Sequence, residues 1–130
     1  MLGALRVEGP SACVTIEGAT DTEVFETYVR EALCPTLRPG DVVIMDNLSP
    51  HKGAQALDWI TRAGAEVRFL PAYSPDLNPI EPMWSKVKAG LRTAEARTQP
   101  SLLEAIEASL ARVTSQDARN WFAHCGYSVI

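Results

Sequence analysis

The sequence predicts an α/β fold in which a small sheet is followed by a helical C-terminal third. Three observations carry this prediction: two short β-like runs near the start, a strand–helix–strand unit in the middle, and helical patterns after residue 78. With 130 residues the chain is long enough for one hydrophobic core, and we predict a single domain over 1–130.

The composition is that of an ordinary globular protein, with 46% hydrophobic and 22% charged residues. The apolar runs, such as 42–45, are too short to span a bilayer, so we expect no membrane segment. The three cysteines are far apart and form no Cys-x-x-Cys motif, which predicts reduced thiols and a cytoplasmic protein. A net charge of −4 argues against tight, sequence-independent DNA binding by this chain alone.

The first expected element is a hairpin formed by residues 2–7 and 12–17, with a Gly-Pro-containing break between them. In its second half, Val14 and Ile16 alternate with more polar neighbours, which is typical of a strand with one dry face.

An amphipathic helix is expected next, ending near Leu33 because Pro35 follows. Thr20 and Glu23 have the spacing of a capping box, and Asp21 is an alternative cap.

Residues 41–47 form the clearest strand, and their apolar middle predicts a strand covered on both faces. A helix should begin at Ser49, with Pro50 as its first residue, and end at Gly64. A second strand at 66–70 would then lie parallel to the first through a right-handed crossover.

The last third begins with a stiff proline-rich loop over 71–82 and continues as helices. Ser101 and Glu104 have capping-box spacing ahead of one helix, and a final helix over about 116–124 should stop at Gly126.

Two acids follow the strands of the central unit. Asp46 ends the first strand, and Glu81 begins the helix after the second, with 34 residues between them. Ligands of open α/β sheets bind at the carboxyl ends of the strands, so both carboxylates can converge there. Two hard oxygen ligands suit Mg²⁺.

Each acid alone also has a simpler interpretation, which composition by itself favours. Asp46 can form a turn with the residues after it. Glu81 can be the reciprocal acid of a capping box, with Asn78 as cap and Pro79 as first helical residue.

Two longer strings carry a family resemblance. Residues 69–88, FLPAYSPDLNPIEPMWSKVK, resemble the signature around the last catalytic acid of insertion-sequence transposases in the mariner-like superfamily (the insertion-sequence six-thirty family). Residues 43–52, VIMDNLSPHK, resemble the segment with that family's second catalytic Asp, and the gap of 34 residues matches its Asp-Asp-34-Glu pattern. Residues 121–127, WFAHCGY, look like its C-terminal helix.

This resemblance implies a ribonuclease-H-like mixed sheet and a DDE endonuclease site in which Asp46 is the second acid and Glu81 the third. It further implies two divalent ions, Mg²⁺ or Mn²⁺, which activate water and then a 3′-hydroxyl against DNA phosphodiesters. The implied partner is DNA, as transposon ends and as target. The candidates for DNA contact are His51, Lys52, Lys86 and Lys88.

The sequence departs from this family in one feature. The family's first catalytic Asp lies on a strand before the hairpin, and this sequence has no such strand. Glu8, Glu17 and Asp21 do not lie in a matching motif. We therefore expect a truncated, C-terminal part of a transposase that lacks the first strand, has an incomplete metal site and is inactive alone. The edge of residues 42–46 should then be unpaired.

Two alternatives remain open from the sequence. One is a non-catalytic remnant that binds or modulates a full-length transposase, as a mixed or homo-oligomer. The other is a ribonuclease or resolvase on the same scaffold, against which the string SPDLNPIE at 74–81 speaks.

Overall fold

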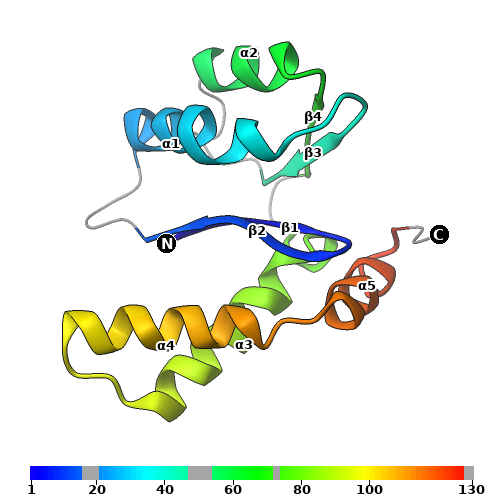
Figure 1. Cartoon of the computed structure of the whole chain (residues 1–130). Helices are drawn as coiled ribbons and strands as arrows, with labels where there is room; N and C mark the ends of the chain where they lie inside the picture. Colours follow the sequence, from blue (N-terminus) through cyan, green and yellow to red (C-terminus); the bar gives the residue numbers. More distant parts are fainter. Residues whose placement is uncertain (16–20, 47–53, 72–73, 128–130) are drawn as a thin grey trace. The chain divides into compact units, whose positions relative to one another are not determined.

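The computed structural model describes residues 1–15, 21–46, 54–71 and 74–127, and it confirms an α/β fold with a helical C-terminal third (Figure 1). The strands and helices are β1 (Leu2–Arg6), β2 (Gly9–Val14), α1 (Thr22–Tyr28), β3 (Val42–Met45), α2 (Ala54–Arg62), β4 (Glu66–Phe69), α3 (Ile80–Ala94), α4 (Gln99–Ala111) and α5 (Ser115–His124). The chain divides into two compact units, one of residues 1–4 and 11–78 and one of residues 5–10 and 79–130.

The N-terminal hairpin is present as predicted, with β1 and β2 paired in a two-stranded sheet. Its turn is shorter than expected, because only Val7 and Glu8 separate the strands. Gly9 adopts a φ of +136°, a conformation open to glycine, and already belongs to β2. The predicted end of this strand at Ile16 and Glu17 lies outside the described residues.

Helix α1 begins at Asp21, whose Oδ1 accepts a hydrogen bond of 2.8 Å from the backbone N–H of Val24. The alternative cap is therefore the one used, while Thr20 lies outside the described residues. A π-helical segment, Val29–Leu33, continues the helix to the predicted end before Pro35.

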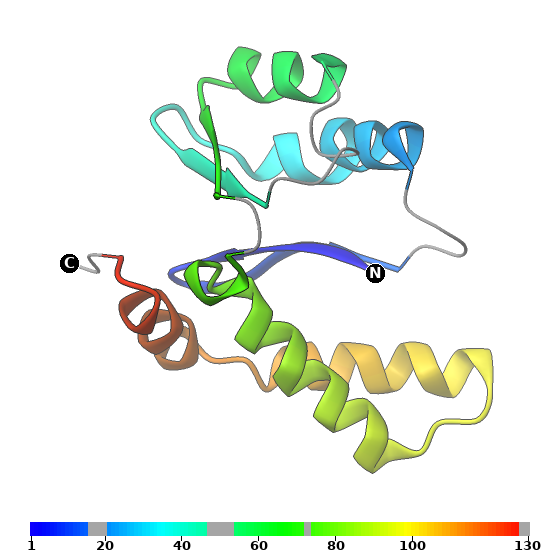
Figure 2. The same cartoon turned by 180° about the vertical axis from the view of Figure 1, so that it is seen from behind.

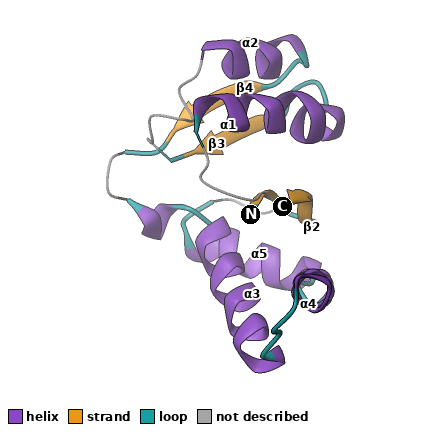
Figure 3. Cartoon of the chain, turned by 90° about the vertical axis from the view of Figure 1, so that its left-hand side faces the viewer, coloured by secondary structure: helices purple, strands orange, loops and turns teal. Residues whose placement is uncertain are grey.

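Strands β3 and β4 are parallel, as predicted, with Val42 opposite Glu66 and Met45 opposite Phe69. Within the described residues β3 pairs with β4 alone, which agrees with the expected unpaired edge. The prediction of a strand covered on both faces is wrong at its start, where Val42 is 48% exposed, whereas Met45 is 7% exposed. Side chains alternate along a strand, and only the face of Met45 meets the core beside α1 and α2 (Figure 3).

The core of this first unit gathers apolar side chains from α1, the π-helical segment, β3 and α2. Its buried members are Phe25, Tyr28, Val29, Leu33, Met45, Ala56, Ile60 and Ala65. Helix α2 ends near Gly64 as predicted, with a φ of +90° at that residue. Its predicted start at Ser49 and Pro50 lies outside the described residues.

The second unit is built on α3, which crosses α4 (Figure 2). Met83, Val87 and Val113 form its buried centre. The cap of α4 is Thr98, which shares a capping box with Ser101, so the predicted cap at Ser101 is wrong. The helix begins at Gln99, so Ser101 is its third residue. Pro100 then lies in the first turn, where proline is tolerated.

Across the described residues, no helix combines the length and the apolar character that crossing a bilayer requires. Cys13, Cys34 and Cys125 are free thiols.

Candidate functional site

Asp46 lies directly after β3, at the carboxyl end of a parallel strand, as the sequence predicts. The strand end is fixed because the N–H of Leu70 donates a 2.7 Å hydrogen bond to the carbonyl of Met45. The Asp46 side chain is half-buried, and its Oδ1 atom is shielded from solvent. The turn that the simpler interpretation requires begins at Asn47 and lies outside the described residues.

Glu81 lies in the first turn of α3 and is exposed. The cap of α3 is Pro79, which provides no side-chain hydrogen bond. Proline also lacks the backbone N–H that a reciprocal capping-box acid would bind, so the capping interpretation of Glu81 is wrong. Asn78 is buried next to the helix start but is not its cap. In the described part of the chain, the Glu81 carboxylate makes no hydrogen bond or ion pair.

The two acids belong to different units, Asp46 to the first and Glu81 to the second. Their convergence at one metal stays a prediction. Among the described residues, no three His, Cys, Asp or Glu side chains gather into a metal-binding group. Both acids offer carboxylate oxygens, the ligand type that Mg²⁺ and Mn²⁺ prefer, so the donor set fits such an ion.

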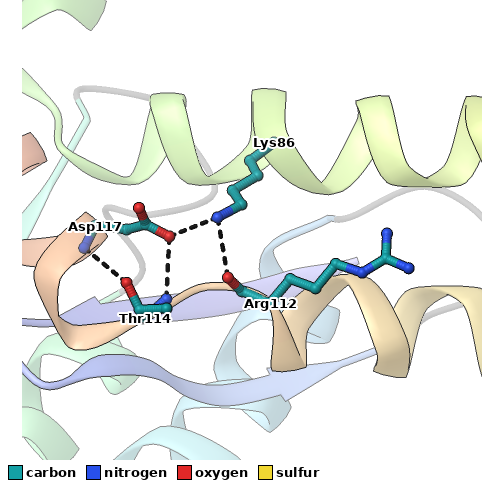
Figure 4. Close-up of polar contacts among 4 residues, drawn as sticks. All are labelled: Lys86, Arg112, Thr114 and Asp117. Atoms are coloured by element: carbon teal, nitrogen blue, oxygen red, sulfur yellow. Dashed lines mark hydrogen bonds and ion pairs between the residues drawn. The ribbon is translucent and has the colours of Figure 1, made fainter.

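The two predicted cations of α3 have different surroundings. Lys86 Nζ lies 2.6 Å from Oδ2 of Asp117 and donates a 2.9 Å hydrogen bond to the carbonyl of Arg112 (Figure 4). Lys88 is exposed, and within the described residues its ammonium has no ion pair. The other two DNA-contact candidates, His51 and Lys52, lie outside the described residues.

Helical geometry explains the difference. At 3.6 residues per turn, a side chain seven positions after Glu81 lies about 20° from it around the helix, whereas one five positions after lies about 140° away. Lys88 therefore shares the face of Glu81, and Lys86 points instead toward the junction of α4 and α5.

The network around Asp117 was not predicted from the sequence. The Asp117 Oδ2 atom accepts the N–H of Thr114, and the Thr114 hydroxyl accepts the N–H of Asp117 (Figure 4). The Lys86 hydrogen bond, and next the Thr114 N–H, lower the pKa of the Asp117 carboxyl below its ordinary value. The sequence contains a signal for the capping part of this network, because residues 114–117 have the Thr-x-x-acid spacing of a capping box.

Comparison with known proteins places this chain in a family. A model of the DDE superfamily endonucleases matches residues 1–103, which include both acids. The chain is 30% identical over 108 residues to the Tcb1 transposase of a Caenorhabditis briggsae transposable element, covering 78% of this chain and 40% of that protein. It is 31% identical over 84 residues to the Tc1 transposase of Caenorhabditis elegans, covering 62% of this chain and 31% of that protein.

The chain thus spans less than half the length of these two relatives. The resemblance predicted from residues 69–88 is nevertheless confirmed, because the matched range contains that whole string. The chain belongs to the DDE superfamily of endonucleases.

Proposed function

We propose that this chain provides the catalytic-domain part of a DNA transposase that cuts and joins phosphodiester bonds at transposon ends. The observation that carries the proposal is the pair Asp46 and Glu81, each placed at an element end where its carboxylate can serve as a ligand. Both lie in the range that matches the DDE family, and the relatives named above are transposases.

Membership of this superfamily implies the use of divalent metal ions. We propose that Asp46 and Glu81 hold Mg²⁺ or Mn²⁺, with Asp46 anchored by the β3–β4 ladder. When bound, such ions activate water or a 3′-hydroxyl for in-line attack on a phosphodiester. The Glu81 side chain is exposed and is not used for capping, so it is available to a ligand.

The finer arrangement is proposed from the same resemblance. We propose a ribonuclease-H-like sheet in which the edge of β3 that has no partner strand among the described residues accepts a further strand, with the acid that completes the metal site on it. The 130 residues by themselves are then expected to bind metal weakly and not to cut DNA. DNA binding should also be weak and sensitive to salt, because the net charge is −4.

Calorimetric titration of the purified chain with Mn²⁺ tests the proposal. We expect a saturable heat of binding that Asp46→Asn and Glu81→Gln each abolish. Glu104→Gln, which removes one exposed carboxylate from α4, is the matched control and should leave the heat unchanged. Equal binding by all four proteins would refute the assignment of Asp46 and Glu81 as ligands.

A further inference from the structure

A pocket of about 190 Å³ lies between α3 and α4 in the second unit. It is lined by Lys86, Ala89, Gly90, Thr93, Ser109 and Arg112. From α3, the adjacent pair Ala89 and Gly90 lies three or four positions from both Lys86 and Thr93, so these residues form one side of that helix. Gly90 follows Glu81 by nine positions, which places it on the opposite side of α3 from that acid. The pocket is therefore distinct from the face that carries Glu81 and Lys88.

Gly90 lets α4 approach α3 closely beside this pocket. A Cβ atom built on it would collide with Oγ of Ser109 and would lie 3.9 Å from Nη1 of Arg112. The hydroxyl and the guanidinium thus both approach the space that the missing side chain leaves. Any larger residue at position 90 would have to displace the Ser109 side chain.

The groups around this space are hydrogen-bond donors. Ser109 is only 4% exposed, and within the described residues no hydrogen bond of its hydroxyl is found. Arg112 is exposed, and in the same described part its guanidinium carries no ion pair. A guanidinium presents a planar set of N–H donors that matches the oxygens of a phosphate.

Lys86 adds a third donor that is held in place. Two of the three N–H bonds of its ammonium point to Asp117 and to the carbonyl of Arg112. Within the described residues the third N–H has no partner, and Lys86 lines the pocket. Asp117 offsets the charge of Lys86, so Arg112 supplies the net positive charge of the site.

We propose that this pocket binds a phosphate group, with Arg112 as the charged ligand and Ser109 and Lys86 as further donors. The family match ends at residue 103, so Ser109 and Arg112 lie outside it. Phosphate binding stands independently of the proposed function. Only the identity of the phosphate as part of a DNA backbone rests on that function.

The first arm of the test uses inorganic phosphate on the purified chain, with EDTA present and the ionic strength held constant with chloride. We expect saturable changes in the NMR signals of the Gly90 and Ser109 amides and of the Arg112 side chain. Arg112→Ala should abolish them and Ser109→Ala should weaken them. Arg119→Ala, which removes an exposed arginine from α5, is the charge-matched control.

The second arm measures binding of a duplex DNA by fluorescence anisotropy over a range of salt concentrations. If the phosphate belongs to DNA, Arg112→Ala should reduce the slope of log K against log salt by about one, and Arg119→Ala should not. If only the first arm responds to Arg112→Ala, the pocket takes a free phosphate instead. Gly90→Ala should block both responses, and its thermal denaturation shows whether it folds.

The proposal is overturned if phosphate and chloride give the same changes, or if Arg112→Ala responds like the unmodified chain. These assays contain no metal ion, so phosphate binding can be confirmed or refuted independently of the proposed metal site. Asp46→Asn and Glu81→Gln should leave phosphate binding unaltered even if they fail to bind Mn²⁺.

Discussion

The ammonium of Lys86 and the carboxylate of Asp117 lie 2.6 Å apart and join the middle of α3 to the first turn of α5. The same ammonium holds the carbonyl of Arg112, the residue that ends α4. One side chain therefore connects all three C-terminal helices. Glu81 lies five residues before Lys86 on α3, so this connection also fixes the helix that presents the proposed metal ligand.

The Asp117 network predicts a loss of stability in acid. The folded-state pKa of Asp117 is lowered, so the carboxylate stabilises the fold fully above the ordinary carboxyl pKa of about 4. That stabilisation is lost as the pH falls through the lowered pKa. Thermal denaturation of the unmodified chain and of Asp117→Asn should differ most near neutral pH and converge in strong acid.

Lys86→Met provides the second half of this test. It removes the ion pair and the hydrogen bond to the Arg112 carbonyl but leaves the capping hydrogen bonds of Thr114 and Asp117. It should lower the melting temperature, and it should shrink the pH dependence contributed by Asp117. A pH dependence equal to that of the unmodified chain would show that Lys86 does not set the pKa of Asp117.

Replacement of Tyr28 by Phe should stabilise the first unit. Tyr28 is 6% exposed, and its hydroxyl has no hydrogen-bond partner among the described residues. Burial is also the main cause of its raised pKa. A buried hydroxyl without a partner costs about 1–3 kcal/mol, so Tyr28→Phe should raise the free energy of unfolding in urea by about 1 kcal/mol or more. A decrease would indicate that the hydroxyl has a partner in the folded chain.

Lys88 is the cation of α3 that we expect to contact DNA on the face of Glu81. Lys88→Ala should weaken binding of duplex DNA and reduce the salt slope by about one, because one phosphate contact is lost. Its melting temperature should be unchanged, since the side chain is exposed and has no ion pair within the described residues. An unchanged salt slope, measured by anisotropy, would place the DNA elsewhere.

Periodicity and caps predicted most of the elements because they are local properties of the chain. Asp21, Gly64 and the parallel pairing of β3 with β4 all follow from such patterns. The solvent exposure of the two faces of β3 could not be predicted in the same way. The exposure of Val42 depends on which distant segments pack against each face. The role of Lys86 likewise depends on α5, whose contact with α3 is a long-range property.

The candidate site likewise combines local motifs, which could be predicted from the sequence, with long-range contacts, which could not. The spacing of Asp46 and Glu81 and the string around Glu81 identified the family, and the family match confirms it. The structure then excluded the capping interpretation of Glu81, because Pro79 occupies the cap position. The pocket at Gly90 could not be predicted, because it forms where two helices meet.

The central claim is that Asp46 and Glu81 bind the same metal ion, and paramagnetic Mn²⁺ tests it most directly. Mn²⁺ broadens the NMR signals of nearby nuclei, so the backbone signals of both acids should broaden together at the same low Mn²⁺ concentration. Either Asp46→Asn or Glu81→Gln should abolish the broadening at both positions, and Glu104→Gln should not. Broadening at only one acid, or broadening at Glu81 that persists in Asp46→Asn, would contradict a shared metal site.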